Sequence, residues 1–125
     1  MILDTNAVSA LFLGDRALGA VLDAADRHHL PVVVIGEYRH GLLGSRDRSR
    51  LEGLLETLIQ ESIVLPVDRS TAEEYSQVRH ELRQRGRPIP ENDIWIAALA
   101  CQHLQPVVTR DDHFDQVPEL RRVAW

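Results

Sequence analysis

The chain has 125 residues, enough for one domain that buries roughly two-thirds of its unfolded surface. It is 44% hydrophobic and 26% charged, which is ordinary for a soluble globular protein. No apolar run approaches the ~20 residues that a membrane span requires, and the N-terminal segment lacks the pattern of a signal peptide. The single cysteine cannot form an internal disulfide, which suits a reducing cytoplasm, where we expect the protein to act.

The net charge of −5 argues against a general nucleic-acid coat but leaves room for a local basic surface. Apart from histidine, all 14 basic side chains are arginine and none is lysine. Any mechanism that requires a catalytic lysine is therefore excluded.

The chain opens on a predicted strand. Three apolar residues, Met1–Leu3, run into Asp4, which is the pattern of a buried parallel strand whose C-terminal end opens into a site. Thr5 or Asn6 can cap the helix predicted over residues 7–13.

A second helix and a second strand are predicted next. Asp15 is placed to cap a helix that continues to about residue 29, with apolar residues at helical spacing. Pro31 then precedes the β-branched run Val32–Ile35, which predicts a buried strand. Glu37 lies just past its end.

The middle of the chain contains a further helix, strand and helix. Leucines at helical spacing predict an amphipathic helix over residues 51–59, and Ile63–Leu65 predicts a short strand. Ser70 is predicted to open the following helix, with Glu73 in a capping box. That helix is expected to end at Gly86.

The last third of the chain again alternates predicted helices and strands. Asp93 lies at the start of an apolar run that predicts a central buried helix over residues 94–101. A strand is predicted at Pro106–Thr109, with Asp111 just beyond it, and a last strand near residues 122–125. Alternating strands and helices predict an α/β fold, a three-layer α/β/α sandwich with a small central parallel sheet, in one domain over residues 1–125.

Carboxylates occupy the junctions of these elements. In an open parallel sheet the ligand crevice lies beyond the C-terminal ends of the strands, where Asp4, Glu37 and Asp111 are expected. Asp93 can face the same crevice from its helix. Four carboxylates this close repel one another unless cations neutralise them, and oxygen ligands favour Mg²⁺ or Mn²⁺. Such an ion suits phosphodiester hydrolysis.

Each acid also has a structural explanation when it is taken alone. Asp4 is a plausible helix cap, Glu37 a solvated helix residue, Asp93 a first-turn acid beside the helix dipole, and Asp111 a turn former. The functional hypothesis depends on their joint placement, because four caps have no reason to converge on one edge of a sheet.

Four segments carry a resemblance to a known family. They are the opening I-L-D-T-N, then E-Y-R-H-G-L, N-D-I-W-I-A-A, and finally V-V-T-R-D-D-H-F. In this order and at these spacings the chain resembles the PIN-domain ribonucleases, and among them the VapC-type toxins of bacterial toxin–antitoxin pairs. The resemblance covers the chain nearly end to end.

The resemblance implies a divalent-metal-dependent endoribonuclease, with Mg²⁺ or Mn²⁺ as cofactor and RNA as substrate. By position, the acidic quartet is Asp4, Glu37, Asp93 and Asp111, and the polar supports are Thr5, Asn6, Asn92 and Thr109. Asp112 and Asp115 compete for the fourth acidic position. Apolar helical surface in excess of what a small sheet covers, together with the resemblance, predicts a homodimer and a small antitoxin partner.

Outside the quartet, arginine is the residue type of interest. Arg79, Arg83, Arg85 and Arg87 lie in one stretch just before Asp93. We predict that the last three, Arg83, Arg85 and Arg87, contact RNA phosphates; the alternative is a solvated helix face. The six histidines show no metal-ligand spacing and are predicted to be structural.

Two other functions remain open from the sequence. A phosphoryl-transfer domain on a similar sheet also has an aspartate after its first strand, but it uses a lysine that this chain lacks. A non-catalytic binding module would keep the fold without the chemistry, and the presence of all four acids weighs against it.

Overall fold

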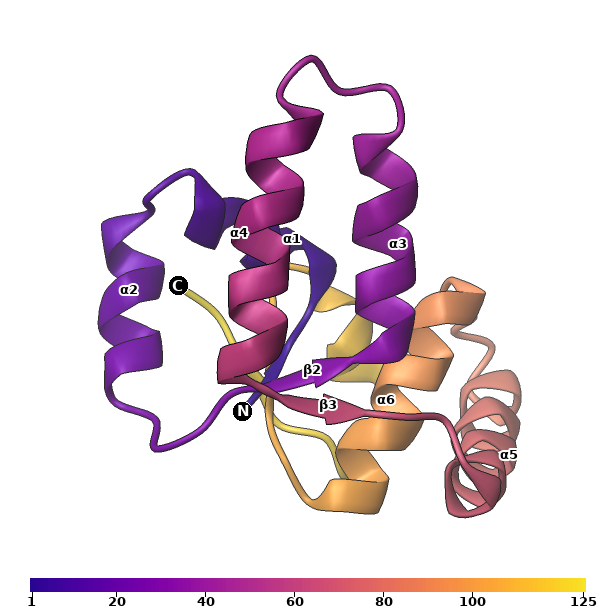
Figure 1. The fold of residues 1–125 in the computed structure, drawn as a ribbon. Helices are drawn as coiled ribbons and strands as arrows, with labels where there is room; N and C mark the ends of the chain where they lie inside the picture. Colours follow the sequence, from indigo (N-terminus) through magenta and orange to yellow (C-terminus); the bar gives the residue numbers. More distant parts are fainter.

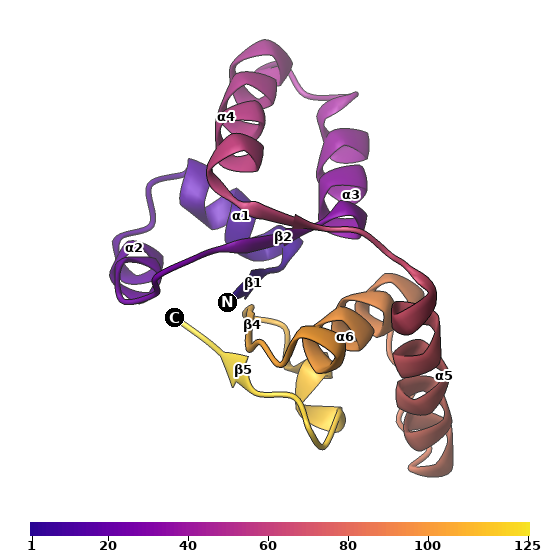
Figure 2. The same cartoon turned by 60° about the horizontal axis from the view of Figure 1, so that its bottom comes forward.

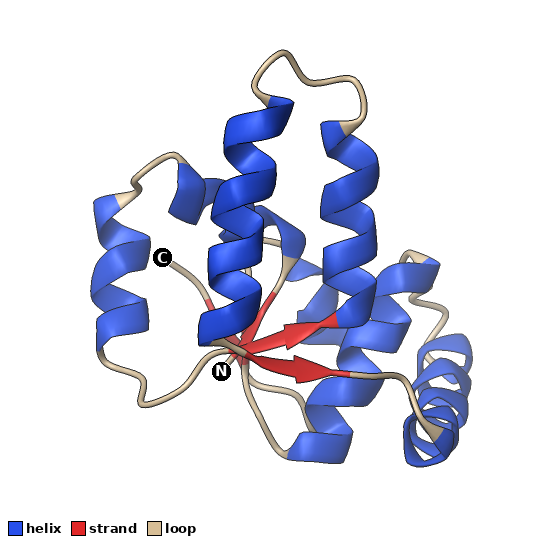
Figure 3. Cartoon of the chain, viewed as in Figure 1, coloured by secondary structure: helices blue, strands red, loops and turns tan.

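One small parallel sheet lies at the centre of the chain, whose 125 residues are all described by the computed structural model (Figure 1). The strand order is β3-β2-β1-β4-β5, and every neighbouring pair is parallel. The strands are only two or three residues long (Figure 3). They are β1 (Ile2–Leu3), β2 (His29–Pro31), β3 (Ile63–Leu65), β4 (Val107–Val108) and β5 (Arg122–Val123).

Helices cover both faces of the sheet, so the predicted three-layer α/β/α sandwich is confirmed. They are α1 (Thr5–Phe12), α2 (Arg16–Asp23), α3 (Val32–Leu42), α4 (Arg48–Glu61), α5 (Arg69–Gln84), α6 (Glu91–His103) and the 3₁₀ helix η1 (Asp112–Gln116). Figure 2 shows α1 to α4 on one side of the strands, and α5 and α6 on the other. None of these helices combines the length and the apolar character needed to cross a membrane.

The direction of the chain through the sheet reverses at β1. From β1 it moves outward to β2 and then β3, and it returns through α5 and α6 to β4 on the other side of β1. Leu3 of β1 and Val108 of β4 are in register, so the residues that follow them leave the sheet side by side. Ligand sites of open parallel sheets form at such a reversal.

The core is built around β1, β4 and α6. Ile2, Leu3, Val107 and Val108 have no exposed surface, and the α6 segment Ile96–Leu99 is equally buried. The prediction of α6 as a central buried helix is therefore confirmed. Because the strands at the reversal are held in this core, the polar residues at their ends are fixed in position.

The prediction of a strand over Val32–Ile35 is wrong. These residues form the first turn of α3, and the strand is the preceding segment, β2, which ends at Pro31. Val34 and Leu42 are buried at helical spacing, and Tyr38 between them packs against the core. Packing of this apolar helical face overrides the β-propensity of the β-branched run, because propensity is a weak preference.

Two helix caps also differ from the prediction. Asp4 caps α1 in place of Thr5 or Asn6, and its Oδ1 accepts a hydrogen bond from the Thr5 N–H at 2.7 Å. Helix α5 begins earlier than expected, with Asp68 and Thr71 forming the capping box that was predicted for Ser70 and Glu73. The helix after Asp15 is capped as predicted, although it ends at Asp23 rather than near residue 29.

The cap of α5 gives a first testable prediction. The Asp68 carboxylate accepts hydrogen bonds from the Thr71 N–H and from the Gln102 side-chain amide, both at 3.0 Å. Asp68→Ala removes these acceptors and is expected to lower the free energy of unfolding by about 1–2 kcal/mol. Ser70→Ala, the matched control at the other candidate cap, should change it by less than about 0.5 kcal/mol. Urea denaturation of both variants measures the difference, and equal losses would contradict the assignment.

Candidate active site

Asp4 lies at the point where the sheet reverses, and it is almost fully buried, with 4% of its surface exposed. The Thr109 hydroxyl, just past β4, donates to Asp4 Oδ2 at 2.8 Å, and the Asn6 side-chain amide donates to the same oxygen at 3.3 Å. With the Thr5 N–H on Oδ1, three hydrogen bonds converge on one carboxylate. Burial raises the pKa of Asp4, while the bonds from Thr109 and Thr5 act in the opposite direction.

Thr109 and Asn6 extend this network to the segment after β4. The Thr109 hydroxyl oxygen accepts from the Asn6 amide at 3.0 Å and from the Asp111 N–H at 2.9 Å. Asn6 Oδ1 accepts from the Arg110 N–H at 3.2 Å. The Arg110 side chain is held in turn by Asp15 and by the ring of Trp125. The backbone that carries Asp111 is thereby fixed to the start of α1.

Asp93 and Asp111 meet around a histidine. Asp93 lies in the first turn of α6, and Asp111 caps η1 by accepting from the His113 N–H at 3.2 Å. The His113 ring Nδ1 lies 3.2 Å from Asp93 Oδ2 and 2.9 Å from Asp111 Oδ1. One ligand atom from each of these three residues lies within 4.8 Å of the others. The group has the size of a metal-binding cluster.

Burial and neighbouring charge both act on this cluster. The pKa of Asp93 is raised to about 6, chiefly by burial and also by the nearby charges of Asp4 and Asp111, against the hydrogen bond from His113. The bond to Asp93, followed by the charge of Asp111, raises the pKa of His113. The charge of Asp111 thus acts against the negative charge of both Asp4 and Asp93, and a bound cation would offset this effect.

Glu37 joins the site from α3 rather than from the end of a strand. Its Oε2 accepts a hydrogen bond from the Thr5 hydroxyl at 3.3 Å, and Thr5 follows Asp4 directly in the chain. Its Oε1 is buried and has no hydrogen-bond partner. A buried carboxylate oxygen without a donor is costly, and a cation is one group that can satisfy it.

The predicted site residues are not all drawn into this network. Thr5, Asn6 and Thr109 bind the acids as described, whereas Asn92 is exposed and its side chain makes no hydrogen bond. Asp112, the competitor for the fourth acidic position, is exposed and lies outside the three-residue cluster. Asp115, the other competitor, forms an ion pair with Arg122.

His113 is the residue that the sequence did not single out. It is predicted to be structural with the other histidines, and the structure places it between two of the candidate acids. No regular spacing of histidines marks it. Its position two residues after Asp111 is the one available signal, because the first residues of a helix lie close to the side chain that caps it.

The donor set fits a divalent cation. Carboxylate oxygens gather at the reversal, Glu37 Oε1 has no donor, and the three-residue cluster contains no lysine or arginine. Oxygen donors of this kind select hard ions.

Comparison with known proteins agrees with this geometry. The PIN domain family matches residues 1–120. The chain belongs to the PIN domain family. Over 115 residues it is 34% identical to Ribonuclease VapC5 of Mycobacterium tuberculosis, an alignment that covers 90% of this chain and 84% of the relative. It is 31% identical to Toxin FitB of Neisseria gonorrhoeae, with 89% and 87% covered.

Solved structures show the same PIN fold. The crystal structure of VapBC-5 from M. tuberculosis, a member of the VapBC family of toxin–antitoxin systems, superposes with a TM-score of 0.80 at 32% identity and covers 99% of this chain and 97% of that one. FitAcB from N. gonorrhoeae gives a TM-score of 0.83 at 26% identity, with 97% and 94% covered. VapBC2 from Rickettsia felis, bound to a promoter DNA fragment, gives 0.89 at 22% identity with 99% and 97% covered, which shows the fold.

Thermal melts of this PIN domain can distinguish a metal ligand from a simple helix-turn acid at Asp93. Asp93→Asn removes one of several crowded negative charges, so with a chelator present it is expected to raise the melting temperature by about 2–5 °C. The stabilisation that Mn²⁺ gives should shrink to less than about half of the wild-type shift, since that gain follows from binding affinity.

Asp23→Asn is the control, because Asp23 is exposed at the end of α2 and carries the same charge change. It should keep the full Mn²⁺-induced shift. If Asp93→Asn keeps it as well, Asp93 is not a metal ligand.

Proposed function

We propose that this PIN domain is a divalent-metal-dependent endoribonuclease and the toxin of a toxin–antitoxin pair. One observation carries the proposal: Asp93, Asp111 and His113 meet beside the buried Asp4 at the sheet reversal of a chain whose relatives are named ribonucleases. Caps and turn formers do not need to meet, whereas a metal-dependent hydrolase needs such a cluster.

The proposed metal ligands are the acidic quartet, Asp4, Glu37, Asp93 and Asp111, and the proposed ion is Mg²⁺ or Mn²⁺. When bound, the ion would supply a Lewis acid and an activated water for phosphodiester hydrolysis. His113 is assigned a positioning role, since its ring nitrogen orients the carboxylates of Asp93 and Asp111.

The remaining residues of the network hold these ligands in place. Thr109 and Asn6 fix the orientation of the Asp4 carboxylate, and Thr5 fixes that of Glu37. Such hydrogen-bonded supports restrict the rotamers of metal ligands. Asn92 remains a predicted support through its place beside Asp93. Arginines at the end of α5 are proposed to contact RNA phosphates: Arg83, Arg85 and Arg87.

A protein partner is the second part of the proposal. VapBC-5 is a member of the VapBC family of toxin–antitoxin systems, which supports a small antitoxin for this chain. A hollow of about 300 Å³ between α1 and α4, lined by Leu11, Phe12, Leu54 and Leu58 among others, offers apolar surface for it. Leu13 and Leu43 are also exposed, by 85% and 61%.

The alternatives fit less well. A phosphoryl-transfer domain would need a lysine, which the chain lacks. A non-catalytic module would have no use for a buried carboxylate oxygen without a donor, such as Glu37 Oε1.

Cleavage is expected to depend on Asp4. Asp4→Asn replaces a metal ligand by a neutral amide and should lower Mn²⁺-dependent cleavage of a defined RNA panel by about 100-fold or more. Circular dichroism and a thermal melt establish that the variant is folded. Asp23→Asn, prepared in the same way, should cut at the wild-type rate and controls for contaminating nuclease. Wild-type activity in Asp4→Asn would indicate that Asp4 acts only as a helix cap.

Self-association is expected as well. The exposed leucines predict that the isolated chain forms a homodimer. Static light scattering coupled to size-exclusion chromatography, over a hundredfold range of concentration, should give twice the 14.2 kDa chain mass. A mass of one chain at every concentration would contradict the dimer.

A further inference from the structure

The connection between α5 and α6 separates two hollows on the surface. Gly86, Pro88 and Ile89 contribute to the walls of both, one of about 440 Å³ and one of about 380 Å³. The positive φ of Gly86, +61°, turns the chain out of α5, and the prolines keep the connection extended. The segment therefore forms a ridge with a hollow on either side.

The first hollow, here called the proximal hollow, continues the candidate active site. Besides Gly86, Pro88 and Ile89, it is lined by Arg87, Asp112, His113 and Gln116. His113 also contacts Asp93 and Asp111, so one side chain borders both the acidic cluster and this hollow. A strand whose phosphate lies at the acids would enter the proximal hollow next.

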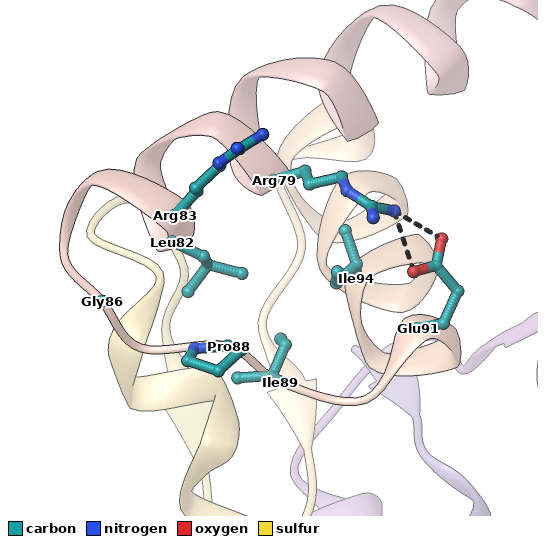
Figure 4. Close-up of a pocket in the computed structure, with 8 residues that line it drawn as sticks. All are labelled: Arg79, Leu82, Arg83, Gly86, Pro88, Ile89, Glu91 and Ile94. Carbon is teal, nitrogen blue, oxygen red and sulfur yellow. Dashed lines mark hydrogen bonds and ion pairs between the residues drawn. The ribbon is translucent and has the colours of Figure 1, made fainter.

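The second hollow, here called the distal hollow, lies across the ridge between α5 and α6 (Figure 4). Leu82, Pro88, Ile89 and Ile94 give it aliphatic walls. Figure 4 shows Arg79 extended past Ile94 to Glu91, with which it forms an ion pair at 2.9 Å. Arg83 lies about one turn further along α5 and makes no such pair.

Two of the eight arginines that form no ion pair border these hollows. Six of the 14 arginines form ion pairs with acids, namely Arg39, Arg48, Arg50, Arg79, Arg110 and Arg122. Arg83 and Arg87, one in each hollow, are exposed and in no ion pair or side-chain hydrogen bond, and the Gln116 amide in the proximal hollow is equally free. A chain of net charge −5 thus leaves guanidinium groups available beside its acidic cluster.

We propose that the proximal and distal hollows bind two successive nucleotides of the RNA strand on one side of the scissile phosphate. Arg87 and Arg83 contact the phosphates, the aliphatic walls cover base or ribose surface, and the Gln116 amide meets a base edge. The proposal rests on the proposed ribonuclease function. RNA is favoured over a peptide because the hollows are continuous with the acidic cluster and present free arginines.

The test uses oligoribonucleotides that share one cleaved step and carry zero, one or two further nucleotides on either side. Extension on one side only should raise kcat/KM in two steps of about tenfold each, while extension on the other side should have little effect. Arg87→Gln should remove the first step, and Arg83→Gln should remove the second while leaving the first.

A charge-matched control separates a subsite from general attraction. Arg46 lies in the remote turn between α3 and α4 and lines neither hollow. Arg46→Gln should keep both steps. Binding of the same oligonucleotides to Asp4→Asn, measured by fluorescence anisotropy with Mn²⁺, should show the same two steps without cleavage.

The outcomes distinguish this proposal from the one on which it rests. Cleavage of the panel without any length dependence, or length steps that survive Arg83→Gln and Arg87→Gln, would overturn the subsites and leave the ribonuclease intact. If the length steps survive both substitutions, the hollows would be open to a protein partner. Failure of the wild-type protein to cleave or bind any RNA with Mn²⁺ would overturn both proposals.

Discussion

The hydrogen bond from Thr109 to the buried Asp4 carboxylate is the interaction on which the rest of the site depends. It joins the ends of β1 and β4, the neighbouring strands at which the chain reverses direction through the sheet. A carboxylate with 4% exposure needs such donors, because burial alone disfavours its charge. The same hydroxyl accepts from the Asp111 N–H, so the bond that stabilises the first acid also positions another.

Capping and site chemistry are therefore compatible roles of the same carboxylates. Asp4 caps α1 and Asp111 caps η1, as their structural explanations suggested, and Asp93 lies in the first turn of α6. In a parallel sheet, helices begin at the carboxyl ends of strands, so acids that cap them are brought to one edge. The cost of bringing their charges together is then a property of the fold, and a cation can offset it.

The sequence was informative where one residue decides the local structure, and less so where packing decides it. Asp4 and Asp111 follow apolar runs that could only be strands. Their location at the C-terminal edge of the sheet was therefore predictable. The prediction of a strand at Val32–Ile35 was wrong because the three-residue strand β2 already ends at Pro31. The β-branched run that follows belongs to α3, whose apolar face packs against the core. The inward position of His113 and the exposed position of Asn92 were not predictable for a related reason. Which side chain turns inward depends on the rotation of η1 and α6, which sequence spacing does not fix.

Electrostatics finally links the acidic cluster to the arginines outside it. A phosphate at contact distance from one carboxylate is repelled by about 4 kcal/mol at the effective dielectric of a protein surface, and this cluster holds several. A bound cation reverses the sign locally, but it cannot extend that attraction to the neighbouring phosphates of a strand. Arg83 and Arg87 lie where that attraction is needed, and both are free of acidic partners. On an acidic chain, these two unpaired arginines place positive charge beside the site, where a polyanion would have to approach.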